Sequence, residues 1–135
     1  MVGGYAVSHP FQYVTLRCVP RVDREEFVNV GIVLYSQSAD VLTAAWHLDG
    51  ARLRALDPGL DVDALRCALE TVAAICAGAS GGGLPVLTSL GRRFGWLSAP
   101  RSTVLQPGPL HGGQCAHPEL EVERLMRRLV LIDAG

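Results

Sequence analysis

An arginine-rich stretch without acidic residues is the part of this chain whose residue types could do chemistry. From residue 71 to residue 118 there is no Asp or Glu. An arginine guanidinium matches the oxygens of a carboxylate or phosphate through two parallel hydrogen bonds, so such a stretch favours an anion. The sequence therefore indicates an anion site around Arg101, completed by backbone N–H groups and polar side chains. The residues of this stretch that bear on such a site are Arg92, Arg93, Arg101, Ser102, Thr103, Gln106 and His111.

Arg101 also has a purely structural interpretation. The charged segment 21–26 carries Glu25 and Glu26, and Arg101 could pair with either of them. Removing one member of a buried ion pair is strongly destabilising, because it leaves an uncompensated charge inside the protein. Arg92 and Arg93 are interpreted as part of a solvated face. The sequence leaves open whether Arg101 belongs to a ligand site or to an ion pair.

The sequence gives only weak signals for a metal site or for a catalytic nucleophile. His111, Cys115 and His117 have the spacing H-x3-C-x-H, which offers soft ligands for zinc, but no CxxC or second ligand pair accompanies them. A Cys115 nucleophile with His111 as its base lacks an identifiable carboxylate to orient the histidine. Ser102 does not lie in a G-x-S-x-G elbow, and no Lys-Ser or Lys-Thr follows the glycine-rich segment 78–83. We therefore expect no metal, no cofactor and no phosphate-binding loop.

The cysteines and aromatic residues are interpreted as core. The four cysteines form no CxxC pair, and Cys67 and Cys76 point to opposite sides of the helix that is expected to carry them. We interpret all four as reduced thiols that pack like small hydrophobic residues. Phe94, Trp96 and Tyr35 have no accompanying basic stripe of the kind that binds nucleic-acid bases, so core packing is expected for them.

Three strands are expected in the N-terminal third of the chain. The second has the clearest pattern, because its apolar residues alternate and should share one buried face. Those residues are Val28, Val30, Ile32 and Leu34. A turn separates the second strand from the third, so the sequence predicts an antiparallel meander. The expected strand ranges are 11–20, 27–36 and 41–48.

Two helices are expected to cover this sheet. Asp61 can cap a helix over 61–77, and a proline opens a second helix over 118–132, with glutamates early and arginines late. Residues 93–109 lie among prolines and glycines and are predicted to form two short strands or extended segments with little helix. The predicted fold is α+β, with an antiparallel sheet made of the N-terminal three-stranded meander plus one or two later strands, covered by the two helices.

Composition places the chain among globular domains. It has 135 residues, 49% of them hydrophobic and 19% charged, and its net charge is −1. The charge balance argues against nucleic acid as a partner. There is no apolar run long enough to span a membrane and no signal-peptide pattern at the start. We expect a cytoplasmic protein with a single domain over 1–135, in which 1–9 form a loosely ordered extension.

Two long motifs resemble those of a known bacterial family. The first begins at Leu16-Arg17-Cys18-Val19-Pro20 and continues through Arg24 and the run from Glu26 to Leu34. The second runs from Arg93 to Pro107 and is followed by His111. In order and spacing, from about residue 11 to residue 133, they resemble the family called domain of unknown function 3037. The positions that fit its motifs are Arg17, Arg24, Glu26, Asn29, Gly31, Trp96, Pro100, Arg101, Ser102, Gln106 and His111.

The chain departs from the family pattern at several positions. Cys18 replaces the usual aromatic residue and Arg21 the usual acid, while Gly108 and Gly112 stand where hydroxyl residues are common. His117 occupies a position where the family tends to have an acidic helix cap. These departures weaken any claim for a hydroxyl cluster near His111 or for a shared metal site.

The resemblance implies a context but no activity. Members are often encoded beside HipA-like kinases, so we expect a small accessory domain that binds a partner protein, a HipA-like kinase being the one suggested. The alternative is a small enzyme or ligand-binding protein that acts on a phosphorylated or carboxylated molecule. A flat patch would favour the partner and a concave pocket the alternative. In both hypotheses the contact surface is built from Arg17, Arg24, Glu26, Asn29, Arg101, Ser102, Gln106 and His111.

Overall fold

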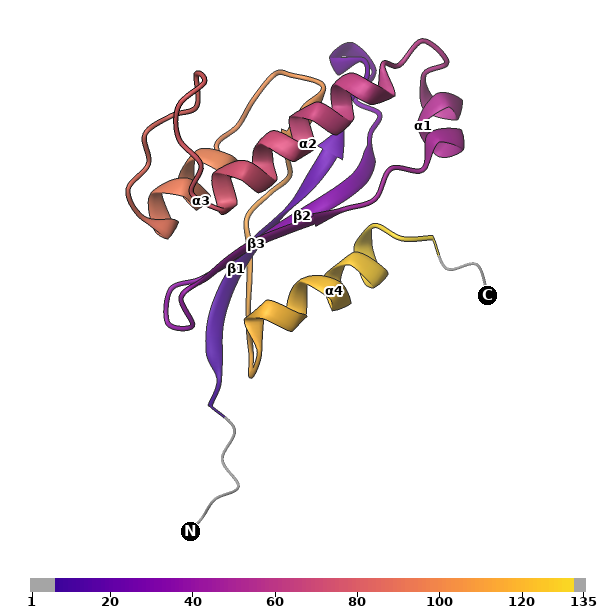
Figure 1. Cartoon of the computed structure of the whole chain (residues 1–135). Helices are drawn as coiled ribbons and strands as arrows, with labels where there is room; N and C mark the ends of the chain where they lie inside the picture. Colours follow the sequence, from indigo (N-terminus) through magenta and orange to yellow (C-terminus); the bar gives the residue numbers. More distant parts are fainter. Residues whose placement is uncertain (1–6, 133–135) are drawn as a thin grey trace.

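Alternating apolar residues in the first part of the chain form the strands that the sequence predicts. The computed structural model describes residues 7–132, and Figure 1 shows a twisted sheet that lies between helices. In chain order the elements are β1 (His9–Cys18), a 3-10 turn (Val22–Arg24), β2 (Val28–Ser36), β3 (Val41–Trp46), α1 (Gly50–Leu56), α2 (Val62–Cys76), α3 (Leu90–Ser98), β4 (Leu105–Pro107), β5 (His111–Cys115) and α4 (Pro118–Leu129).

The sheet is antiparallel throughout and confirms the predicted α+β fold. Its strand order is β3-β2-β1-β4, so the first three strands are the expected meander. On its other side β1 has two partners, β5 along residues 9–13 and β4 along residues 16–18. The expected loose extension over 1–9 is only partly testable, because residues 1–6 lie outside the described part of the chain. His9 already pairs with Cys115 in the sheet.

The two predicted helices form where their capping signals lie. Asp61 Oδ1 accepts a hydrogen bond from the Ala64 N–H at 2.9 Å, which satisfies an otherwise unpaired donor at the start of α2. Pro118 occupies the first turn of α4, where its missing N–H costs nothing. In Figure 1, α2 and α3 lie on one side of the sheet and α4 on the other.

A third long helix, α3, corrects the sequence prediction. Residues 90–98 are helical, although the sequence analysis expected little helix in 93–109. Leu90, Phe94 and Leu97 follow helical spacing, and Ser89 Oγ accepts a hydrogen bond from the Arg92 N–H at 3.2 Å. The short helix α1 was not predicted either.

The apolar residues of β2 do not share one face, which is a second correction. Arg17 pairs with Asn29 but Leu16 pairs with Gly31, so Val30 is an extra residue, a β-bulge. A bulge reverses the alternation of faces beyond it. Val28 and Val30 therefore point toward α2, whereas the residues after the bulge, Ile32 and Leu34, point toward α4.

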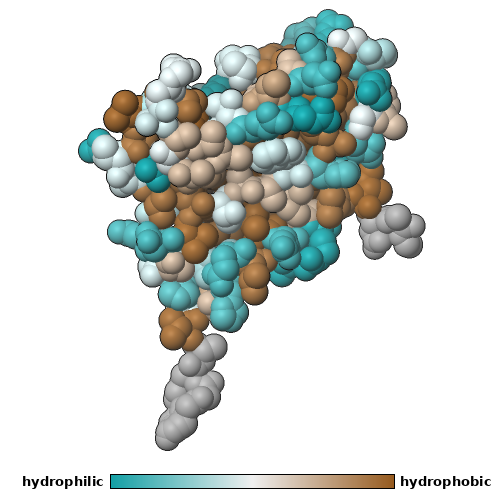
Figure 2. Space-filling model, viewed as in Figure 1, coloured by the Kyte–Doolittle hydropathy of each residue, from teal (hydrophilic) through white to brown (hydrophobic). Residues whose placement is uncertain are grey.

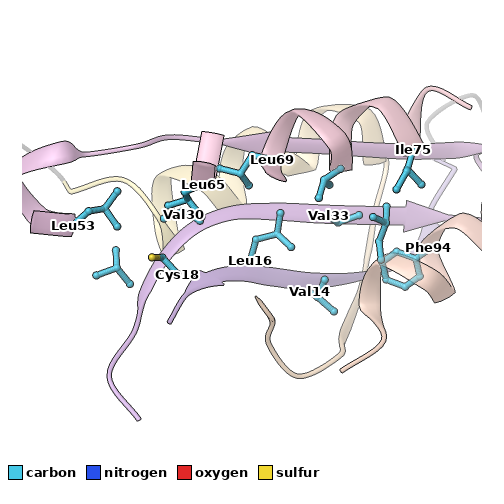
Figure 3. Packing of buried hydrophobic residues seen from close by; sticks show 13 residues of the cluster. Val14, Leu16, Cys18, Val30, Val33, Leu53, Leu65, Leu69, Ile75 and Phe94 are labelled. Carbon is cyan, nitrogen blue, oxygen red and sulfur yellow. The ribbon is translucent and has the colours of Figure 1, made fainter. Parts of the chain in front are cut away.

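This change of face gives the protein two apolar cores. The larger one lies between the sheet and the pair α2 and α3 (Figure 3), and the smaller one lies between the sheet and α4. Figure 3 shows Leu16, Cys18 and Val30 pointing from the strands toward Leu65 and Leu69 of α2. No helix in the described part of the chain is long and apolar enough to cross a membrane.

Candidate functional site

Three of the predicted site residues lie side by side on the face of the sheet that α4 packs against. Arg17 of β1 stands opposite Asn29 of β2 on one side and opposite Gln106 of β4 on the other. The Arg17 guanidinium carbon lies 4.0 Å from the centre of the Phe27 ring, a cation–π contact. Asn29 Nδ2 donates to the Leu129 carbonyl at 3.1 Å and so ties the last turn of α4 to the sheet.

His111 lies on the same face but farther along the strands. It pairs with Tyr13 in the sheet, and the two rings are stacked with centres 5.2 Å apart. Tyr13 and Arg17 are four residues apart on one strand, which corresponds to about 13 Å. The structure therefore places His111 and Arg17 on one face without bringing them into contact.

Arg101 and Ser102 do not join this group. Arg101 follows α3, and its guanidinium donates to the carbonyls of Trp96 and Leu97, the latter at 3.2 Å. Its guanidinium carbon lies 4.2 Å from the centre of a Trp96 ring. Ser102 is exposed. Because α3 packs on the opposite side of the sheet from α4, the expected convergence of Arg101 and Ser102 with Arg17 and His111 does not occur.

The structural interpretation of Arg101 is also corrected. Glu26 forms an ion pair with Arg24 in the connection between β1 and β2, and both side chains are largely exposed. The Arg24 guanidinium holds the pKa of Glu26 below its usual value. Among the described residues neither Glu26 nor Glu25 pairs with Arg101. Arg101 instead interacts with the carbonyl groups at the C-terminus of α3, where the helix dipole favours a positive charge.

The described residues do not assemble a metal centre or an activated nucleophile. His111 and Cys115 are four residues apart on β5, about 13 Å along a strand, so they cannot share a metal ion or a proton. No cluster of three or more metal-ligating side chains occurs in residues 7–132. Burial is the main cause that raises the pKa of Cys115 and keeps its thiol protonated. For Cys18 and Cys76 burial raises the pKa to about 11.

A concave surface lies between α2, α3 and the segment that leads into β4, and we call it the Trp96 groove. Its volume is about 340 Å³. Its buried apolar lining residues belong to the larger core, whereas Trp96, which also lines it, is exposed and Arg101 is half-buried. The residues that line it are Leu16, Ala68, Thr71, Val72, Ile75, Trp96, Leu97, Arg101, Thr103, Leu105, Gln106 and Pro107.

The Trp96 groove combines an apolar floor with a single cation. None of its lining residues is acidic, which is the structural consequence of the acid-free stretch. Trp96 is 40% exposed, so the expected core packing of this aromatic is wrong, whereas Phe94 is buried as predicted. Removal from water lowers the pKa of Arg101, but a guanidinium stays charged at any ordinary pH.

A second, more polar groove runs between α4 and the neighbouring strands β1 and β5, and we call it the α4 groove. It has a volume of about 440 Å³. Phe11 and Tyr13 form part of its floor, and on its α4 wall Arg124 pairs with Glu121. Arg128 lines the same wall and has no ion-pair partner among the described residues.

Comparison with known proteins identifies a family for this chain. A family model described as "Protein of unknown function (DUF3037)" matches residues 13–130. The chain belongs to this family. No curated protein and no solved structure matches it. The structure explains why glycine suits position 31 of the family motif: a Cβ atom there would stand 2.7 Å from the Ala45 carbonyl oxygen, which is too close.

Sequence reasoning missed the partnership of Trp96 with Arg101. The two residues are five positions apart, across the end of a helix that was predicted as extended chain. The helical spacing of Leu90, Phe94 and Leu97 was the signal that could have revealed it, because it places Trp96 on the side away from the core.

Proposed function

We propose that this protein is a binding module without catalytic activity, and that its Trp96 groove holds a short apolar and acidic segment of a partner protein. The observation that carries the proposal is the pairing of an exposed Trp96 with Arg101 above an apolar, acid-free floor. Tryptophan and arginine are, with tyrosine, the residues enriched among the few that carry most of the binding energy of protein interfaces. An apolar side chain of the partner would fill the floor and a carboxylate would meet the arginine.

Arg101 retains the capacity for this role although it caps α3. A guanidinium carries five N–H donors, and the two hydrogen bonds to α3 carbonyls use only part of them. Contact with the Trp96 ring and the two carbonyls fixes its orientation, so little side-chain entropy is lost when a carboxylate binds. Partial removal from water also strengthens its attraction for an anion.

The size and distribution of apolar surface favour a short segment over a large interface. At about 340 Å³ the groove is at the small end of ligand sites. In the view of Figure 2, hydrophobic residues occur in several separate places, interrupted by hydrophilic ones. A few side chains of an extended or helical segment suit such a surface better than a broad flat face does.

The family resemblance suggests a HipA-like kinase as the protein that carries this segment. The groove itself specifies only chemistry, namely a large apolar side chain next to an Asp, a Glu or a C-terminal carboxylate. The test therefore uses synthetic peptides and does not depend on the identity of the partner.

Nuclear magnetic resonance can test the proposal with two peptide pools. One pool combines Leu and Phe with Asp and Glu, and the other replaces the acids by Lys and Arg. We expect the acidic pool to shift the indole N–H signal of Trp96, while the signal of Trp46 serves as an internal reference. A Trp96 signal that responds equally to both pools, or to neither, would contradict the proposal.

Matched arginine variants separate the groove from general charge attraction. Arg101 follows α3 and lines the groove, whereas Arg92 is exposed on α3 and does not line it. We expect Arg101→Gln to weaken binding of the acidic pool about tenfold or more, the equivalent of one charge-assisted hydrogen bond. Arg92→Gln should leave the affinity within about twofold, as expected for an exposed charge outside the groove. Equal losses would show that only net charge matters.

One observation favours a second candidate function, the binding of a phosphorylated or carboxylated small molecule in the α4 groove. Arg128 lines this groove without an ion-pair partner, and Arg127 next to it does not line it. If the groove holds an anion, titration with inorganic phosphate should shift the amide signals of Gly112 and Gly113, and Arg128→Gln should abolish the shift. Arg127→Gln should retain it. A shift that survives Arg128→Gln would remove this candidate.

A further inference from the structure

The outer edge of β3 is an open end of the sheet. β3 stands last in the strand order and pairs only with β2 among the described strands. The His47 N–H donates to the Val30 carbonyl at 2.8 Å. In an antiparallel ladder the N–H and C=O groups of every second residue point toward the paired strand, which here is β2, and those of the residues between them point away from it. The residues that turn their N–H and C=O groups outward are therefore Leu42, Ala44 and Trp46.

This edge carries none of the features that normally prevent strand addition. Residues 41–46, Val-Leu-Thr-Ala-Ala-Trp, contain no charge and no proline, and they pair with β2 in an unbroken register. Edge strands of soluble proteins are usually protected by charged side chains, prolines or bulges. Helices α2 and α4 contact β3 from opposite faces, so it is the edge of the strand that remains open.

We propose that β3 pairs antiparallel with β3 of a second copy of this chain and so joins two sheets into one continuous sheet across a two-fold axis. Two-fold symmetry requires that one residue face itself across the axis. Centring the pair on Ala44 sets Leu42 opposite Trp46 of the second copy and uses all three outward-facing residues. Centring it one residue to either side leaves Trp46 or Leu42 without a strand residue opposite.

The side chains and charges suit this register. Ala44 is the smallest side chain of the three, which allows the two strands to approach at the axis. In this register Leu42 and Trp46 would stand directly opposite each other, at a separation where cross-strand side chains contact each other. Asp40 precedes β3 and His47 follows it, so antiparallel pairing brings the acidic end of one strand to the histidine end of the other. Parallel pairing would set Asp40 beside its own copy.

A second copy is favoured over an unrelated strand by this self-complementarity. The pairing also lies apart from the Trp96 groove, because β3 and β4 are at opposite ends of the strand order. Dimer formation and peptide binding can therefore be tested independently, and failure of one does not decide the other.

Light scattering coupled to size exclusion tests the proposal on the full chain. We expect a mass of twice 14.4 kDa at high protein concentration and dissociation on dilution. Thr43→Lys places a charge on the edge and should give a monomer, whereas Thr88→Lys, on an exposed loop, should remain dimeric. Ala44→Pro removes an N–H that has no partner among the described residues and should also give a monomer.

Amide hydrogen exchange identifies the interface residue by residue. In the dimer the amides of Leu42, Ala44 and Trp46 should exchange slowly, and in the Thr43→Lys variant they should exchange fast. This result with a dimeric wild type supports the proposal. A chain that stays monomeric at the highest soluble concentration overturns it. A dimer in which these three amides exchange fast also overturns it, because the copies then meet elsewhere.

Discussion

Replacing Gly31 by Ala tests the strand register on which both cores depend. A Cβ atom at this position would stand 2.7 Å from the Ala45 carbonyl oxygen, 3.1 Å from Trp46 Cβ and 3.3 Å from Leu16 Cδ1. The first contact is with backbone of the neighbouring strand and cannot be relieved by turning a side chain. Strands β2 and β3 would have to separate, and overpacking of this kind costs about 1–3 kcal/mol.

Gly95→Ala is the matched control, because the same substitution meets no atom within 4 Å on α3. Alanine in the middle of a helix is more favourable than glycine by roughly 0.5–1 kcal/mol, so this variant should be more stable than the wild type.

Thermal unfolding followed by circular dichroism measures both variants. For a chain of this length 1 kcal/mol corresponds to roughly 4 °C in Tm, so Gly31→Ala should melt about 4–12 °C lower and Gly95→Ala about 2–4 °C higher. If Gly31→Ala melted at or above the wild-type temperature, β2 and β3 would not approach each other as described. The assignment of a bulge at Val30 would then be wrong, and so would the assignment of Leu42, Ala44 and Trp46 as the residues whose backbone groups point away from β2.

Three further predictions concern single side chains. Arg101→Ala should lower the free energy of unfolding by about 1–2 kcal/mol in urea denaturation, because two hydrogen bonds to α3 carbonyls are lost; a loss above about 4 kcal/mol would instead indicate a buried ion pair. The pKa of Cys18 rises from 9.0 to about 11, mainly through burial and then through the charge of Asp57. The unfolded chain therefore gives up this proton first, so stability should fall between about pH 9 and pH 11, by at most about 2.7 kcal/mol, and Cys18→Ala should flatten that decline in pH-dependent melting. Ile32→Ala empties a fully buried site beside α4 and should cost about 2–5 kcal/mol by the same denaturation measurement; a loss below about 1 kcal/mol would mean that Ile32 does not pack there.

Local sequence signals were enough to predict most of the strands and helices. The strand β2 and the cap at Asp61 are predictable from a few neighbouring residues, and both are confirmed. The sharing of one face by Val30 and Ile32 was wrong because a bulge depends on how β1 and β2 align, which neighbouring residues do not reveal. Helix α3 was missed because its glycines and the following proline obscured an otherwise regular apolar spacing.

The candidate site was predictable in residue type but not in arrangement. The acid-free stretch singled out Arg101 but left open an ion pair with Glu25 or Glu26, and among the described residues no acidic side chain pairs with it. Its distance from Arg17 could not be foreseen, because it depends on α3 and on the pairing of Gln106 with Arg17 across the sheet. The second motif is divided: Gln106 and His111 lie on the α4 face with Arg17, whereas Arg101 follows α3 on the other side of the sheet.

Intermolecular nuclear Overhauser effects provide the most direct test of the central claim that the Trp96 groove is the binding surface. A single peptide selected from the acidic pool, with isotope-labelled leucine methyl groups, would be added to the full chain. We predict contacts from those methyl groups to the Trp96 ring and to Leu105 and Val72, which also line the groove, and we expect these contacts to be lost in the Arg101→Gln variant. Contacts to Tyr13 or Phe11 in place of Trp96 would contradict this prediction and would assign binding to the α4 groove.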